Sequence, residues 1–169
     1  MKGAVLVAGL LTCASAAVAF GQATGIDSLR FEDYPATDTL RQKPAPVNLR
    51  SYKLATQFRT VLRNGAGRGP NFAGAFTIVT WGCGSSCRIL AVVSARSGRV
   101  YGPWLQYQVA VAYRYDSRLL LVDSPDSVRA VIGRVDQQCA VCGTPGACVW
   151  DQDHFQPLVQ GGHEVTSPR

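Results

Sequence analysis

The sequence predicts an α+β fold: a single domain in which a curved antiparallel β-sheet carries one N-terminal amphipathic helix and is braced by disulfides. Three observations predict this class. Residues 51–66 have a helical apolar period, the segments after them are rich in β-branched and aromatic residues, and cysteines cluster in short loops. The chain has 169 residues, a length typical of one domain. We place the α+β domain at residues 51–160.

The first 23 residues have the pattern of a signal peptide. Lys2 supplies a positive charge, residues 3–20 are uncharged and mostly apolar, and residues 17–19 match the small-x-small cleavage pattern. We expect cleavage between this motif and Ala23, and therefore a periplasmic or secreted location. Two alternatives stay open: a retained membrane anchor, and a lipoprotein that uses Cys13.

Residues 24–50 are expected to form an extended arm that is pinned to the domain, because Pro35, Pro44 and Pro46 interrupt any helical period. The helix over residues 51–66 follows, with Ser51 as its N-cap and a glycine as its stop. Its apolar positions recur at three and four residues: Leu54, Ala55, Phe58, Val61 and Leu62.

Strands are predicted over most of the remaining chain. A hairpin turn at residues 95–99 uses Gly98, which can adopt a positive φ, and a second hairpin turns at residues 151–153. The cleanest alternation, over residues 105–115, predicts one continuous strand. Residues 124–146 are ambiguous between strand and helix, and residues 161–169 are expected to be a flexible tail. The other predicted strands are residues 73–81, 88–94, 100–102, 118–123, 147–150 and 154–159.

Cys83 and Cys87 lie four residues apart in a glycine-containing loop between two predicted strands. In an oxidising compartment, such a pair is expected to close a small disulfide ring. The functional alternative is a redox or nucleophilic thiol with Arg88 beside it, but a reactive thiolate favours a helix N-terminus and the following segment is predicted to be a strand.

A second cysteine group consists of Cys139, Cys142 and Cys148. We expect Cys148 to be bonded to one of the other two, which leaves one free thiol. The alternative is a zinc site completed by His154, although the spacing of the second pair of ligands is not a standard pattern. We expect no metal and no cofactor.

Charge is distributed unevenly along the chain. Residues 39–115 contain no aspartate or glutamate but hold eleven basic residues, and the formal net charge of the whole chain is +6. A cationic surface of this kind attracts anionic partners. We therefore predict a binding face that consists of Arg59, Trp81, Arg88 and Arg96. The alternative interpretation is that the charge serves solubility alone.

The sequence also resembles a family of uncharacterised exported proteobacterial proteins. The resemblance spans most of residues 31–159 and rests on the Gly69-Pro70-Asn71-Phe72-Ala73-Gly74 strand entry and on the tryptophan-glycine-cysteine loop at residues 81–87. It implies export and a common fold. In that family, histidine and tyrosine often follow the glycine of the strand entry, whereas Ala75 and Phe76 stand there in this chain.

Catalytic motifs are sparse. The chain has two histidines and lacks the serine-hydrolase elbow, the Walker loop and the zinc-protease motif. We therefore assign no catalytic residues and expect an exported, non-enzymatic binding protein whose partner is an anionic protein, glycan or lipid head group. Nucleic acid is not expected, because the chain is predicted to be exported. The alternatives are a small thiol-dependent or hydrolytic enzyme around Cys83, Cys87 and Arg88, and a zinc-binding module.

Overall fold

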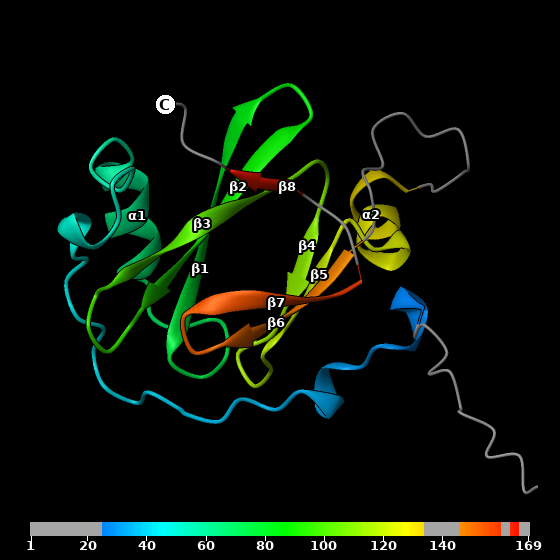
Figure 1. Cartoon of the computed structure of the whole chain (residues 1–169), viewed down its shortest axis with the longest axis horizontal. Coiled ribbons are helices and arrows are strands. Elements are labelled where there is room, and N and C mark those ends of the chain that lie inside the picture. The colour runs from blue at the N-terminus through cyan, green and yellow to red at the C-terminus, as the bar shows by residue number, and fades with distance from the viewer. Residues whose placement is uncertain (1–24, 134–145, 160–162, 166–169) are drawn as a thin grey trace, which may run out of the picture.

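The computed structural model describes residues 25–133, 146–159 and 163–165, which fold into two four-stranded antiparallel sheets and two α-helices (Figure 1). The first sheet has the order β1-β2-β3-β8 and the second the order β4-β5-β6-β7. The α+β class is confirmed, but with two sheets in place of one and with a second helix. The strands are β1 (Phe76–Gly84), β2 (Cys87–Ser94), β3 (Val100–Tyr107), β4 (Val111–Tyr113), β5 (Leu119–Val122), β6 (Gly146–Asp151), β7 (His154–Val159) and β8 (His163–Val165). The helices are α1 (Arg59–Ala66) and α2 (Pro125–Ile132), with short 3₁₀ turns at η1 (Ile26–Ser28), η2 (Phe31–Asp33) and η3 (Leu49–Ser51).

The first sheet is buried on both faces. Along β2, Ile89, Ala91 and Val93 belong to the core between the sheet and α1, whereas Leu90 and Val92 belong to the core between the two sheets. A run of apolar residues without alternation is typical of such a central strand.

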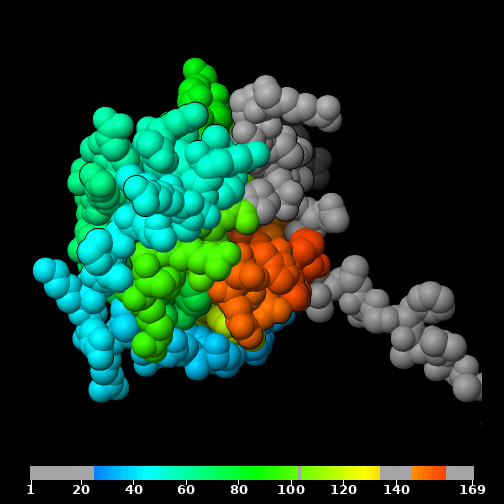
Figure 2. All heavy atoms as spheres, turned by 60° about the vertical axis from the view of Figure 1, so that its left-hand side comes forward, coloured from blue at the N-terminus to red at the C-terminus, as the bar shows by residue number. Residues whose placement is uncertain are grey.

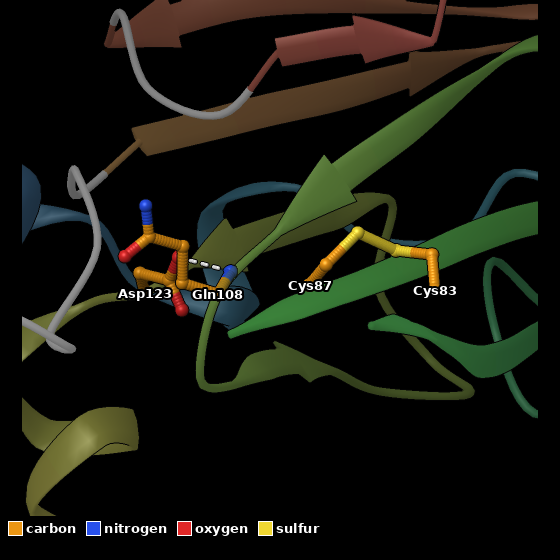
Figure 3. Close-up of a disulfide and its surroundings, with 4 residues drawn as sticks. All are labelled: Cys83, Cys87, Gln108 and Asp123. Carbon is orange, nitrogen blue, oxygen red and sulfur yellow. Dashed lines mark hydrogen bonds between the residues drawn. A yellow bond between two sulfur atoms is a disulfide. The ribbon is translucent and has the colours of Figure 1, made fainter. Parts of the chain in front are cut away.

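The predicted continuous strand over residues 105–115 is wrong, because the chain passes from the first sheet to the second within it. Strand β3 ends at Tyr107 and β4 begins at Val111. Between them, the buried carboxylate of Asp123 accepts the backbone N–H groups of Gln108, Val109 and Ala110 at 2.8–2.9 Å. Figure 3 shows the bond from Gln108. The alternation continues across the break because residues on both sides of it face the same inter-sheet core.

Helix α1 is shorter than predicted, since residues 53–58 form turns and the helix begins at Arg59. Ser51 does not cap it. Its Oγ accepts the N–H of Val100 at 2.8 Å, which fixes the segment to β3 instead. The predicted apolar stripe nevertheless packs on the sheet as expected, with Ala55 and Leu62 fully buried. A Cβ at Gly65 would lie 2.6 Å from Val79, so this glycine lets α1 approach β1 closely.

The ambiguous segment after residue 124 contains α2, which Ser124 caps through its side chain. Gly133 follows the helix in the left-handed conformation that commonly ends helices. The hairpin of β6 and β7 is confirmed, with its turn at the predicted position.

The arm is pinned to the domain over its described length, as predicted. Backbone N–H groups of Ala36, Leu40, Ala45 and Asn48 donate to carbonyls of the domain, each at 2.8 Å. Figure 1 shows the arm, blue to cyan, running along one side of both sheets. Its first part packs on the outer face of the second sheet through Ile26, Leu29, Phe31 and Tyr34.

The predicted flexible tail is corrected in part, because residues 163–165 form β8 and pair with β3. The edge of β3 has free backbone groups that this pairing satisfies. The predicted signal peptide, Cys139 and Cys142 lie outside the described residues. Within the described residues, no helix is long and apolar enough to cross a membrane.

Candidate functional site

The cysteine loop closes the β1–β2 hairpin. Cys83 and Cys87 form the predicted disulfide with their Cα atoms 5.1 Å apart (Figure 3). The two sulfur atoms are bonded to each other, so a thiol-dependent reaction here would require reduction of the bond first. The loop therefore braces the hairpin tip.

Trp81 forms part of the core rather than an open binding platform. Its ring lies 5.0 Å from that of Phe58 and 5.1 Å from that of Trp104, measured between centroids. The side chain is half-buried in the cluster between the first sheet and α1. Its contribution to the site is to hold the segment that leads into α1.

Arg96 is occupied by an ion pair. Its guanidinium donates two hydrogen bonds to the carboxylate of Asp38, with Nε at 2.7 Å, and a third to the carbonyl of Thr39. The hydrogen bond from Arg96 lowers the pKa of the Asp38 carboxyl. Arg96 therefore fastens the arm to the β2–β3 turn, and the prediction that it belongs to a free cationic face is corrected.

Arg88 lies on the opposite face of the first sheet from α1. Successive side chains of β2 alternate, and the next residue, Ile89, faces α1. Arg88 accordingly interacts with the hydroxyl of Tyr107, a residue of the inter-sheet core whose pKa is raised by burial. Arg88 is at the start of β2 and Arg96 is in the turn that follows its end at Ser94, and the six residue steps from Arg88 to Ser94 alone span about 20 Å. The structure thus does not bring Arg59, Arg88 and Arg96 together around Trp81.

A different group of cations lies on α1 and on the segments that lead into and out of it. Figure 2 shows the cyan and blue-green atoms of this part of the chain side by side on the face that is turned forward. The group has six members, and the side chains of all six are exposed. No ion pair joins any of them to another described residue. We call this surface the helix face, and it consists of Lys43, Arg50, Lys53, Arg59, Arg63 and Arg68.

Two hollows flank α1 on this face. The smaller, of about 310 Å³, lies between the arm and the helix and is lined by both Lys43 and Arg63. The larger, of about 740 Å³, lies between α1, the following loop and the edge of β1. Among the described residues, no carboxylate lines either hollow. The lining of the larger one includes Thr60, Asn64, Arg68, Asn71, Thr80 and Tyr113.

Elsewhere on the described surface, three arginines are paired with carboxylates, whereas Arg30, Arg41, Arg88, Arg99 and Arg118 are not. Arg96 pairs with Asp38, Arg114 with Glu32 and Asp116, and Arg129 with Asp126. The sequence reasoning identified one member of the helix face, Arg59, and missed the others as a group. The signal that could have identified them is the four-residue spacing of Arg59 and Arg63 on the polar side of the helix.

The two described residues of the possible zinc site, Cys148 and His154, do not lie together. Cys148 lies opposite Leu120, whose side chain belongs to the inter-sheet core, while His154 is exposed at the start of β7 and hydrogen-bonds Asp153. Cys148 pairs with Pro157, so His154 is three residues, about 10 Å, further along the hairpin. Within the described residues, no group of three candidate ligands lies together.

Cys148 is a free, buried thiol in this structure. Its predicted disulfide partners, Cys139 and Cys142, lie outside the described residues, so that pairing stays a prediction. Burial raises the pKa of this thiol from its usual 9.0 to about 11. The unfolded chain therefore ionises the thiol at a lower pH than the folded protein does. Stability that is fully present below pH 9 should be lost as the pH rises towards 11, by about 2–3 kcal/mol.

Urea denaturation at several pH values between 8 and 11 measures this effect. We expect the difference in unfolding free energy between the wild type and Cys148→Ala to shrink over this interval, because the variant lacks the titrating group. A constant difference would show that the thiol does not ionise on unfolding.

Compared with family models, curated proteins and solved structures, the chain matches none of them. The fold and the charge distribution are therefore the evidence from which a function is proposed.

Proposed function

We propose that this is an exported, non-enzymatic binding protein that engages an anionic partner through the helix face. The observation that carries the proposal is a group of six exposed cations, on α1 and the segments next to it, without a carboxylate partner. Arg96, Arg114 and Arg129 have carboxylate partners on the described surface, whereas the six cations of the helix face have none. Cations that the fold leaves unpaired on and next to one helix are available to a partner.

Binding of an anionic partner would require several cations of the helix face to act together. A single exposed ion pair contributes only about 0–1 kcal/mol, so no individual arginine of the helix face would hold a partner. Several like charges on one surface sum to a potential that attracts and orients an anionic molecule. Arginine also donates forked hydrogen bonds that fit carboxylate and phosphate groups. The partner classes that this chemistry accommodates are an acidic protein, a sulfated glycan and an anionic lipid head group.

Charge reversal of the helix tests the proposal. We expect the double variant Arg59→Glu/Arg63→Glu to lose about 100-fold or more in affinity for polyglutamate, heparin or phosphatidylglycerol vesicles at low salt. Its melting temperature should stay close to that of the wild type, because both side chains are exposed and glutamate is a good helix former.

The matched control is Arg30→Glu/Arg129→Glu, which makes the same change in net charge at exposed positions outside the helix face. It should retain most of the affinity. Equal losses in the two double variants would mean that net charge alone matters, and the helix face would then have no special role.

A further inference from the structure

Strand β1 is at the edge of the first sheet, and one part of that edge is covered by the chain itself. The side-chain amide of Asn71 imitates a neighbouring strand: its nitrogen donates to the carbonyl of Ile78 at 3.1 Å, and its oxygen accepts the N–H of Ile78 at 2.8 Å. The main chain of Asn71 and Phe72 pairs with Phe76 in the same way at 3.0 Å. The first half of the edge is thereby satisfied.

The second half of the edge is open. In an antiparallel strand, the N–H and C=O groups of every second residue point to the same side. Because those of Ile78 point away from β2, those of Thr80 and Gly82 do so too. Within the described part of the chain, β2 is the only strand that pairs with β1. The N–H and C=O groups of Thr80 and Gly82 therefore form a row of free donors and acceptors.

The surroundings of this row leave room for another chain. The 740 Å³ hollow beside α1 includes Thr80 in its lining and continues the line of the edge. No atom lies within 4 Å of where a Cβ would stand on Gly82 or Gly84. Figure 1 shows the β1–β2 hairpin projecting from the molecule, and the Cys83–Cys87 disulfide holds its two strands together at the tip.

We propose that an extended acidic segment of a partner polypeptide adds to β1 as a further strand at Thr80 and Gly82. This inference rests on the proposed function and specifies the partner. Main-chain hydrogen bonds to an exposed edge give affinity, and pockets for alternate side chains give specificity. One face of the added strand is on the side of α1, where Arg68 lines the hollow, and the other is on the side of Tyr113. The segment should therefore alternate acidic and apolar residues.

A second copy of this protein is a poorer occupant of the same edge. Two β1 edges that paired with each other would place the helix faces of both copies near the junction. The arginines of each copy would then repel those of the other, since like charges across an interface are unfavourable.

The test uses a capped eight-residue peptide of alternating glutamate and valine. Gly82→Pro removes the outward N–H of residue 82, while the ladder to β2 uses groups of the neighbouring residues. Gly82→Ala keeps the N–H and is the matched control. We expect the wild type and Gly82→Ala to bind the peptide equally, and Gly82→Pro to bind at least tenfold more weakly. Binding to heparin should be unchanged in all three.

A second measurement does not depend on the folding of the proline variant. On the wild type, the peptide should slow hydrogen exchange at the amides of Thr80 and Gly82. A peptide N-methylated at alternate residues, which cannot donate to the edge, should neither bind nor protect.

The outcomes separate the two proposals. If Arg59→Glu/Arg63→Glu loses peptide binding while Thr80 and Gly82 stay unprotected, strand addition is overturned and the helix face stands. Protection of these amides that grows with protein concentration in the absence of peptide would overturn the inference in favour of self-association. If neither the peptide nor heparin binds the wild type, the proposed function fails as well.

Discussion

Replacing Asp123 by alanine is expected to lower the free energy of unfolding by about 3–5 kcal/mol. Asp123 is 2 % exposed, and its carboxylate accepts three consecutive backbone N–H groups where the chain passes between the sheets. Alanine would remove both acceptor oxygens and with them all three hydrogen bonds, and the N–H of Ala110 would stay buried without a partner. Asp123 also has a φ of +44°, which alanine tolerates less well than aspartate does.

The control for this prediction is Asp123→Asn. Asparagine tolerates the positive φ and retains one acceptor oxygen, so it should cost clearly less than alanine. Urea denaturation followed by circular dichroism measures both variants. A loss below about 1 kcal/mol for Asp123→Ala would mean that the crossover between the sheets does not depend on this carboxylate.

Replacing Gly74 by alanine is expected to cost at least about 3 kcal/mol and to release the arm. Gly74 has a φ of +73°, and a Cβ on it would lie 1.8 Å from the carbonyl oxygen of Asp38. The backbone cannot relieve this overlap while the N–H of Leu40 donates to the carbonyl of Gly74. The arm near Asp38 and Leu40 would have to move away, which would also weaken the ion pair to Arg96.

Gly69→Ala separates the cost of backbone strain from the cost of the steric overlap. Gly69 also has a positive φ, +99°, but has open space around it. It should cost only the backbone strain, about 1–2 kcal/mol. Limited proteolysis measures whether the arm is released from the domain. Gly74→Ala should be cut rapidly within residues 36–48, and Gly69→Ala should resist cleavage there. Equal resistance in both variants would contradict the close approach of the arm at Gly74.

Local patterns in the sequence predicted those elements whose cause is local. The burial of β2 on both faces, the turn at Gly98 with its φ of +70° and the hairpin around Gln152 follow from neighbouring residues. The break between β3 and β4 has a distant cause, since the carboxylate that satisfies residues 108–110 is 13 to 15 positions away. Similarly, Ser51 bonds with Val100, 49 residues further along, instead of capping a helix.

The distinction between local and distant causes also applies to the candidate site. Arg59 and its exposure follow from the apolar period of the helix, which is local. Arg96 was predicted to be free because no acidic residue is near it in sequence, but Asp38 is brought to it from 58 residues away by the arm. The position of Arg88 depends on which face of β2 meets α1, and that is fixed only when helix and sheet pack together.

The salt dependence of polyglutamate binding tests the role of the helix face with a single titration. The Debye length falls from about 10 Å at 0.1 M salt to about 3 Å at 1 M, so attraction by unpaired surface cations should weaken steeply over this range. We predict that the affinity of the wild type falls steeply with rising salt, and that Arg59→Glu/Arg63→Glu binds weakly at every salt concentration. A wild-type affinity that does not change with salt, or a variant that follows the same curve as the wild type, would contradict an anionic partner bound at the helix face.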